Sequence, residues 1–191
     1  NVPFIPSLSN TFTVVGTDAN GCKDSDQIQV TVNVLPSVNA GNNVAICIGD
    51  SIQLNGSGAV SYVWDNGVIN NTAFYPTSTL TYHVIGTNAN GCSNSDSVIV
   101  TVNPLPIVFA GNDTTINIDE AYVLHGSSNV TNFGFLNPAG SVLSCNFCSV
   151  VEVTPKVNTC YILKGESSHQ CVAYDEVCIK VTKEYGLFIP N

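Results

Sequence analysis

The eight cysteines are the residues of this chain with the most evident chemistry. Paired cysteines form disulfides in an oxidising compartment, and cysteine clusters bind zinc or act in redox reactions. Cys145 and Cys148 form a C-x-x-C motif, but zinc needs a second such pair or added histidines, and a redox pair needs a helix start. The sequence supplies neither context, so we expect structural disulfides in an exported protein.

The histidines do not stand in a catalytic frame. His83, His125 and His169 lack a G-x-S-x-G, H-E-x-x-H or similar motif around them. The glycine-rich stretch at Gly56–Gly58 is not followed by a helical pattern that would present amides to a phosphate. The sequence therefore predicts a protein that is not an enzyme and carries no cofactor.

Clustered carboxylates are weak candidates for calcium ligands. Asp18, Asp24 and Asp26 surround one hairpin loop, and Asp113 lies near the expected end of a sandwich. Calcium prefers such hard oxygen ligands, but the twelve-residue calcium loop is missing. The favoured interpretation is that these are solvated turn acids that accept bonds from backbone amides.

Composition narrows the function further. The chain has 191 residues, 44% of them hydrophobic and 10% charged, which is typical of a folded protein. A net charge of −9 with only five lysines and arginines disfavours binding to nucleic acid or to an anionic membrane surface. No apolar run reaches the roughly 18 residues of a membrane span. Because the first residues resemble no signal peptide, we expect the natural chain to begin upstream of Asn1.

An internal repeat organises the sequence. The segment TFTVVGTDANGCKDSDQIQVTVN from Thr11 recurs as TYHVIGTNANGCSNSDSVIVTVN from Thr81, a shift of 81 − 11 = 70 residues. A third copy answers the second with a shift of 171 − 92 = 79, read from Cys92 and Cys171. This third copy has gained nine residues between Ser127 and Pro155.

The repeat predicts an all-β fold. Apolar residues alternate with period two, as at Val98, Val100 and Val102, and Asn-Gly turns divide the chain into many short strands. This pattern is typical of antiparallel β-sandwiches. The boundaries expected are half a sandwich at 1–35, complete sandwiches at 36–105 and 106–183, and a tail at 184–191. Short proline-bearing linkers predict sandwiches arranged end to end.

Several motifs resemble a known family. They are P-x-V-x-A-G-N, C-x-G-D-S-I-x-L-x-G-S-G, Y-x-W-D-N-G, Y-x-V-x-G-T-x-x-N-G-C and V-x-V-T-V-N. Together they resemble the immunoglobulin-like (Ig-like), PKD-like tandem repeats of large secreted Bacteroidota proteins. Residues 143–148 resemble the L-S-C-x-x-C variant of these repeats. Residues 187–191 resemble the opening of the gliding-motility-associated C-terminal domain, the type B sorting signal of type IX secretion.

The resemblance implies a function. Such repeats form stalks or adhesive surfaces, and the sorting domain directs export to the cell surface or medium. The implied partners are the type IX secretion machinery, a surface glycan or protein ligand, and further copies of the chain. Ser51, Ser97 and Thr114 lie in Asp-Ser/Thr-apolar triplets that resemble Bacteroidota O-glycosylation acceptors.

Repeat positions suggest how the cysteines pair. Cys47 and Cys92 fall in one complete repeat, so we expect a bridge between them, with Trp64 and Tyr82 packed beside it as in an immunoglobulin domain. The counterpart of Cys92 in the first repeat is Cys22, whose partner we expect upstream of Asn1.

The third repeat needs a different disulfide, because the counterpart of Cys47 is Asn117. Cys160 and Cys178 align with outward-facing positions of adjacent strands, which favours a cross-strand bridge. Cys145 and Cys148 are expected to close a small loop, which leaves Cys171 without an assigned partner.

Three functions remain open at the sequence level. The leading interpretation is a structural or adhesive stalk region of an extracellular surface protein. The alternatives are a spacer in a secreted hydrolase with an upstream catalytic domain, and a filament subunit whose incomplete first sandwich receives strands from another chain. Residues 1–35 are expected to be unstable alone, because Ile28, Val30 and Val32 form an apolar face without an opposing sheet.

Overall fold

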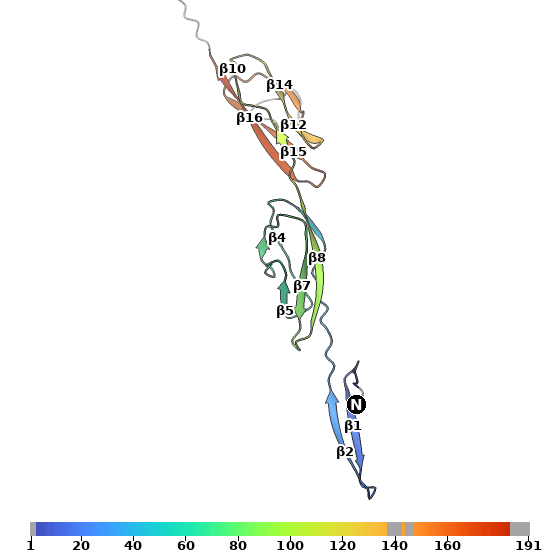
Figure 1. Ribbon diagram of the computed structural model, residues 1–191. Helices are drawn as coiled ribbons and strands as arrows, with labels where there is room; N and C mark the ends of the chain where they lie inside the picture. Colours follow the sequence, from blue (N-terminus) through green and yellow to red (C-terminus); the bar gives the residue numbers. More distant parts are fainter. Residues whose placement is uncertain (1–2, 137–142, 144–146, 184–191) are drawn as a thin grey trace, which may run out of the picture. The chain divides into compact units, whose positions relative to one another are not determined.

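The computed structural model describes residues 3–136, 143 and 147–183, and this part of the chain is built of strands (Figure 1). No helix in that part is long and apolar enough to cross a membrane. The strands are β1 Asn10–Thr17, β2 Lys23–Val30, β3 Val44–Cys47, β4 Ile52–Gln53, β5 Ser61–Trp64, β6 Ala73–Phe74, β7 Leu80–Thr87, β8 Ser93–Asn103, β9 Val108–Phe109, β10 Thr114–Asn117, β11 Tyr122–His125, β12 Ser127–Ser128, β13 Asn132–Phe135, β14 Val150–Val153, β15 Thr159–Glu166 and β16 Val172–Thr182.

The chain groups into two compact units. The first contains Asn1–Val44, Ser51–Tyr75 and Leu80–Val100, and the second contains Ala45–Asp50, Pro76–Thr79 and Thr101–Asn191. The division between them falls within β8 and at the start of β3, so it does not coincide with the repeat boundaries. Those boundaries remain a prediction from the sequence.

The first repeat is a two-stranded antiparallel hairpin of β1 and β2, in register from Asn10 with Val30 to Thr17 with Lys23. Gly21 at its turn has φ of +85°, a conformation that glycine adopts without strain. Apart from Phe12 and Val30, every residue of the two strands is exposed.

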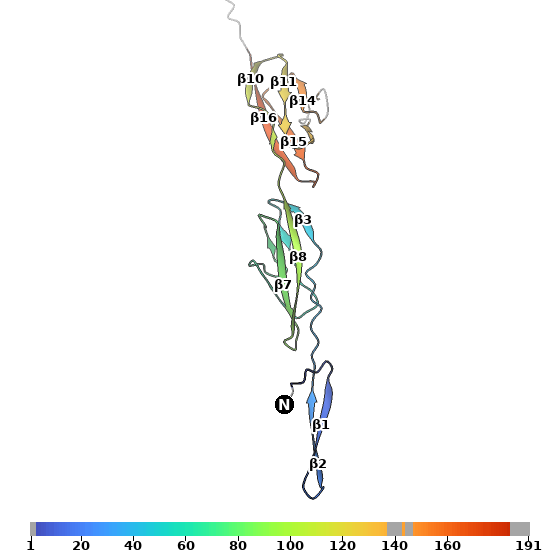
Figure 2. The same cartoon turned by 45° about the vertical axis from the view of Figure 1, so that its right-hand side comes forward.

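The second repeat has two sheets, one in the order β3-β8-β7-β5 and a short one of β4 and β6. The long antiparallel pair of β7 and β8 lies at its centre (Figure 2). Burial alternates along β7, where Tyr82 and Val84 point inward and Thr81, His83 and Ile85 outward, as a strand with one buried face requires.

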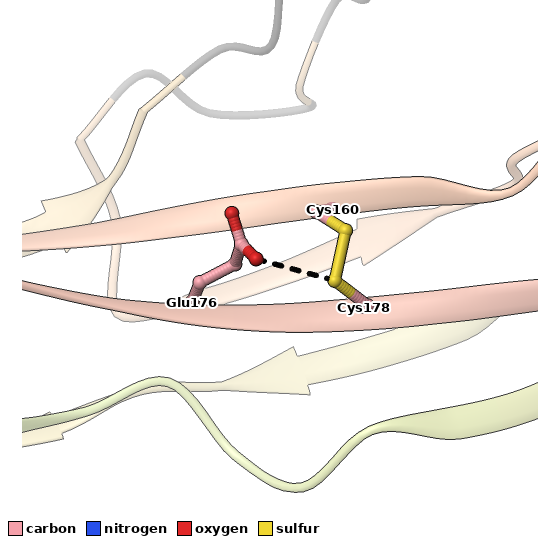
Figure 3. Close-up of side chains that lie close together, drawn as sticks. All are labelled: Cys160, Glu176 and Cys178. Atoms are coloured by element: carbon pink, nitrogen blue, oxygen red, sulfur yellow. Dashed lines mark hydrogen bonds between the residues drawn. A yellow bond between two sulfur atoms is a disulfide. The ribbon is translucent and has the colours of Figure 1, made fainter.

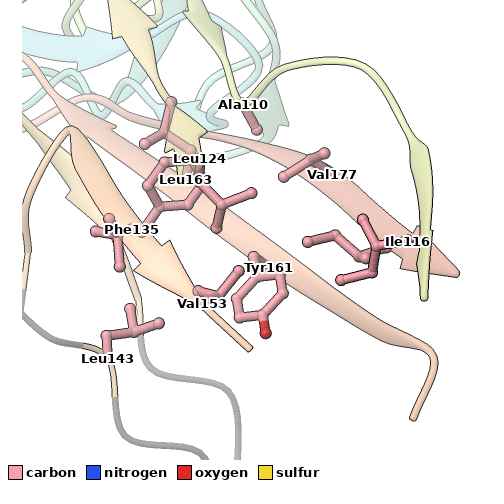
Figure 4. Close-up of a cluster of buried hydrophobic side chains, with 11 residues drawn as sticks. Ala110, Ile116, Leu124, Phe135, Leu143, Val153, Tyr161, Leu163 and Val177 are labelled. Atoms are coloured by element: carbon pink, nitrogen blue, oxygen red, sulfur yellow. The ribbon is translucent and has the colours of Figure 1, made fainter. Parts of the chain in front are cut away.

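The third repeat has the same four-stranded sheet, a two-stranded sheet with longer strands, and an additional short sheet. Its sheets are β10-β16-β15-β13, β11-β14 and β12-β9, and β10 runs parallel to β16. Eleven buried residues form one hydrophobic core between the sheets (Figure 4), with Phe135 and Leu163 fully buried. Burial of side chains of this size stabilises a fold by about 1.5–3 kcal/mol each.

The central hairpin has the same register in the second and third repeats. Cys160 pairs with Cys178 as Thr81 pairs with Ile99, in accord with the 79-residue shift. The strand beside the hairpin differs in its aromatic residue. Trp64 pairs with Val84 in β5 and β7, and Phe135 pairs with Leu163 in β13 and β15, so the fully buried Phe135 takes the place of Trp64.

Candidate functional site

Each long hairpin ends in a loop that holds a cysteine in a fixed position. In the second repeat the Oδ1 atom of Asn88 accepts hydrogen bonds from the backbone N–H groups of Asn90 and Cys92, both at 3.0 Å. Asp18 holds the N–H of Cys22 in the same way at 2.8 Å. In the third repeat Ser167 Oγ accepts from Cys171 N at 3.2 Å. The side chain at the start of the loop therefore fixes the backbone that presents the thiol.

A second cysteine position ends the first strand of the complete repeat, at Cys47 of β3. The N–H of Cys47 donates to Asp50 Oδ2 at 3.1 Å, and the N–H of Asp50 donates to Cys47 O at 3.0 Å. Asn117 and Glu120 make the same two bonds in the third repeat, at 2.9 and 3.1 Å. The turn is thus retained where the cysteine is not.

These two kinds of cysteine are joined, but not as the sequence suggested. Cys47 is bonded to Cys171, with Cα atoms 5.5 Å apart and a sequence separation of 124. The expected bridge between Cys47 and Cys92 is therefore wrong, and Cys92 is a free thiol of intermediate exposure. The odd cysteine of the third repeat is the partner of Cys47.

The strand arrangement gives the physical reason. β3 lies beside β8. The N–H of Ile48 donates to Asn103 O at 2.9 Å, so Cys47 lies next to the C-terminal end of β8. Cys92 comes just before Ser93, the first residue of β8. A strand rises about 3.3 Å per residue, which places the two ends of β8 about 33 Å apart. A disulfide needs Cα atoms within about 7 Å, so the two cysteines of this repeat cannot meet.

The bridge expected between Cys160 and Cys178 is present, and it joins the facing residues of β15 and β16 (Figure 3). Glu176 Oε1 lies 3.4 Å from Cys178 Sγ. A disulfide sulfur has no proton to donate, so this is a contact of the carboxylate with sulfur. Among the described residues, these three form the one group of at least three metal-type ligands within 4.8 Å of one another. The bonded sulfurs are not thiolates, so the group is not a zinc site in this state.

A shallow groove of about 600 Å³ adjoins this bridge. It is lined by Asp113, Thr114, Thr115, Asn158, Thr159, Cys160, Cys178, Ile179 and Lys180. Asp113 Oδ1 accepts from the N–H of Cys178 at 2.8 Å, which occupies one of its oxygens. The groove is open to solvent, and the Asp113 carboxylate that lines it already accepts a hydrogen bond from the backbone of β16.

The expected loop between Cys145 and Cys148 lies partly outside the described residues. Cys148 is disulfide-bonded, and Cys145 is not among the residues described. The pairing of these two stays a prediction.

Trp64 is a core residue, as expected, but it does not pack beside a bridge between Cys47 and Cys92. Its side chain is 6% exposed, and Nε1–H donates to Asn70 Oδ1 at 2.9 Å. Tyr82 is also buried, and this burial, together with the charge of Asp65, raises the pKa of its phenol.

The calcium candidates are dispersed and bind backbone amides. Asp18 Oδ1 accepts from Asn20 and Cys22, and Asp24 and Asp26 each accept from the residue that follows. In the described structure, no group of metal-type ligands within reach of one ion includes any of the four aspartates. Calcium binding stays a prediction without a ligand cluster to support it.

A structural carboxylate was missed by the sequence analysis. Asp96 Oδ2 accepts from the N–H of Ala40 at 2.8 Å, and Asp175 Oδ2 accepts from Ala110 in the same geometry at 2.8 Å. This bond fixes the first segment of each complete repeat to its last strand. The bond from Ala40, with a second from Ser97, holds the pKa of Asp96 below its usual value. The available signal was the recurrence of Ala-Gly-Asn together with an Asp two residues before a valine, at Asp96 and Asp175.

The histidines and the candidate O-glycosylation residues lie at or near the surface. His83, His125 and His169 are exposed, as are Ser51 and Ser97, and Thr114 is half-buried. The exposed hydroxyls suit a glycan sterically. O-glycosylation remains a prediction.

The fold assignment comes from the sheets themselves. In each complete repeat a four-stranded sheet is accompanied by two-stranded sheets, one in the second repeat and two in the third. The chain is a tandem of Ig-like β-sandwiches. No family model matches the chain, and no curated protein is detectably similar to it.

Three solved structures illustrate the similarity. The Ig1-2 module of the Drosophila receptor protein tyrosine phosphatase DLAR is 12% identical, with a TM-score of 0.35, over 78% of this chain and 100% of that one. The insect immune protein hemolin is 12% identical, with a TM-score of 0.39, over 92% of this chain and 57% of that one. Immunoglobulin domains 1-4 of Sidekick-1 are 9% identical, with a TM-score of 0.33, over 96% and 73%. At these values the fold assignment rests on strand order and register.

Proposed function

We propose that this chain is a non-catalytic structural or adhesive stalk segment of a large extracellular bacterial surface protein. Repeated Ig-like sandwiches, disulfides and a surface of exposed turns support an extracellular structural role. The observation that carries the proposal is the bond between Cys47 and Cys171, which joins two consecutive repeats covalently.

This bond changes how the chain bears force. A pull between the two ends enters at Cys47, crosses the disulfide and leaves through Cys171. The covalent path bypasses the residues between them, which make up most of two repeats. The sequence separation of 124 residues therefore does not add to the length of the chain when it is stretched. A stalk that resists extension gains from such a bond, whereas a soluble ligand-binding module does not need one.

Single-molecule stretching tests the stalk role. The oxidised chain is expected to reach a contour length about 430 Å shorter than the chain after reduction, at about 3.5 Å for each of the 124 residues. The Cys171→Ser variant, pulled without reductant, serves as the control. It keeps the bridge between Cys160 and Cys178, with a sequence separation of 18, so its contour length is expected to be about 60 Å shorter than that of the reduced chain and about 370 Å longer than that of the oxidised chain. Equal lengths in oxidised and reduced chains would contradict a load-bearing bond.

For the place of action, we propose export by type IX secretion to the surface of a Bacteroidota cell. Support comes from the resemblance of the repeat motifs and of residues 187–191, which lie outside the described residues. An antibody against the repeats is expected to label intact cells with working secretion machinery and to leave cells without that machinery unlabelled. Labelling of both strains would argue against this route.

The adhesive ligand is proposed only by class, as a surface glycan or protein. Filament formation is a second candidate, favoured by the exposed apolar residues of the β1–β2 hairpin, such as Val14 and Ile28 at 66% and 65% exposure. Native mass spectrometry distinguishes a stalk segment from a filament subunit. A monomer at micromolar concentration supports the stalk, and concentration-dependent oligomers support the filament.

A further inference from the structure

Cys92 has the position and the backbone support of a bonded cysteine but no bond. It corresponds to Cys171 by the 79-residue shift, and the loop residue before it holds its N–H in the same way. Cys171 is bonded to the cysteine that ends the first strand of the preceding repeat. By analogy, the partner expected for Cys92 is the cysteine at the end of the first strand of a completed preceding repeat.

Within residues 1–191, no counterpart of the segment that would carry that cysteine stands before the β1–β2 hairpin. In the second repeat this segment is residues 36–70, which contains Cys47, flanks β8 and β7 with β3 and β5, supplies β4 of the second sheet, and packs Val38 and Ala59 against Gly86 of β7. The exposed fractions of equivalent side chains show the effect of this segment. Val84 and Val98 are 0% and 1% exposed, whereas Val14 and Ile28, their counterparts in β1 and β2, are 66% and 65% exposed.

Glycines at equivalent positions show the same contrast. A Cβ atom added to Gly86 would lie 2.6 Å from Val38 and 2.9 Å from Ala59, both within residues 36–70. A Cβ atom added to Gly16, the counterpart of Gly86, would meet no atom within 4 Å. The hairpin therefore retains the small residue that makes room for the covering segment.

We propose that the β1–β2 hairpin and Cys92 together form a binding site for one half-repeat of the 36–70 type, which covers the hairpin and forms a disulfide with Cys92. Two independent features, an open apolar face and an unbonded loop cysteine, are completed by the same segment. A second copy of this chain is not that occupant, because its Cys47 is already bonded to Cys171. The counterpart in the third repeat, Asn117, has no thiol.

Formation of the bond needs an oxidant. The two thiols lose two protons and two electrons to form one S–S bond, and a small-molecule disulfide such as oxidised glutathione accepts them and is cleaved to two thiols. This inference concerns assembly of the repeats and does not depend on the stalk role. A force measurement that failed would leave it standing.

The test completes the first repeat within the full chain. A copy of residues 36–70 is fused in front of Asn1, so that the natural junction of Asn70 with Asn71 is reproduced as Asn70 with Asn1. After folding with oxidised and reduced glutathione, alkylation and non-reducing peptide mapping locate the bonds. The added cysteine is expected to be linked to Cys92, and the number of free thiols at Cys22 and Cys92 to fall from two to one. The fused protein is expected to be a monomer with a protease-resistant hairpin.

A matched control carries Asn in place of the added cysteine, as the third repeat does at Asn117. Both Cys22 and Cys92 are then expected to be alkylated, while the hairpin stays protected. A bond from the added cysteine to Cys22, or a free added cysteine in a folded protein, would overturn the proposal. A disulfide-linked dimer of the unextended chain through Cys92 would overturn it as well.

A second variant tests the pairing rule in the natural chain, should the fusion fail to fold. Cys171→Ser leaves Cys47 without its partner. If bonding occurs only between consecutive repeats, three thiols are expected to be alkylated, at Cys22, Cys47 and Cys92. A bond between Cys47 and Cys92 in this variant would show pairing within one repeat and would refute the proposal.

Discussion

At the scale of single residues, side chains that accept bonds from distant backbone amides fix the sandwiches. Asp96 and Asp175 bind the N–H groups of Ala40 and Ala110, and Asn43 and Asp113 bind those of Ile99 and Cys178. Each bond ties the start of a repeat to its last strand. These side chains explain why short polar residues recur at fixed positions in a chain that is otherwise rich in valine and isoleucine.

Asp96 predicts a specific response to acid. A carboxyl whose folded pKa is below its ordinary value of 3.8 stabilises the fold above that value, and this contribution is lost as the pH falls through the lower folded value. Asp96→Asn keeps an acceptor oxygen but no longer titrates. Its free energy of unfolding is expected to fall less than that of the natural chain between about pH 6 and about pH 2. Urea denaturation at several pH values measures this. Asp119→Asn makes the same change of charge in a turn, and an identical acid response in both variants would contradict the role of Asp96.

Gly86 and Gly16 predict unequal effects of one substitution. Gly86→Ala forces a methyl group to within 2.6 Å of Val38 and is expected to destabilise the second repeat by about 1–3 kcal/mol. Gly16→Ala places the same group in open space and is expected to change stability by less than about 0.5 kcal/mol. Chemical denaturation of both variants checks the contrast. Equal losses would show that the face of β1 is covered after all.

At the scale of elements, the sequence predicted the strands well because the repeat reports on them three times. The 70- and 79-residue shifts map β1 onto β7 and β7 onto β15 without a break, and the outward positions of Cys160 and Cys178 followed from this register. The sequence located the insertion in the third repeat between Ser127 and Pro155. The strand register was needed to identify Phe135 as the residue that takes the place of Trp64.

The sequence did not predict which ends of the strands meet. It placed Cys47 and Cys92 in one repeat, but periodicity carries no information on which end of a sandwich a loop occupies. That information comes from the pairing of β3 with the end of β8, a contact between strands about fifty residues apart in sequence. A signal was present, because the third repeat keeps Cys171 while Asn117 replaces the counterpart of Cys47. Independent loss of one cysteine indicates that the two do not bond within one repeat.

The cross-strand bridge of the third repeat predicts a measurable loss on removal. Cys160→Thr with Cys178→Ile introduces the pair that the second repeat has at Thr81 and Ile99. Because the bridge closes a loop with a sequence separation of 18 residues, its loss is expected to destabilise the third repeat by up to about 3 kcal/mol. Thermal and urea denaturation measure the change. An unchanged midpoint would mean that the replacement pair packs well enough to compensate for the bridge.

At the scale of the whole molecule, the cysteines define a covalent path along the repeats. Cys47 and Cys171 join the second repeat to the third, Cys92 is placed to join the second repeat to a completed first one, and Asn117 ends the series. The bridge between Cys160 and Cys178 serves only its own repeat. This division between connecting and internal bridges is the central claim of the account.

Peptide mapping of the unreduced 191-residue chain tests that claim most directly. After alkylation of free thiols and proteolysis, mass spectrometry is expected to find one disulfide-linked peptide pair with Cys47 and Cys171, a second with Cys160 and Cys178, and alkylated Cys22 and Cys92. A linked pair with Cys47 and Cys92, together with a free Cys171, would contradict the account.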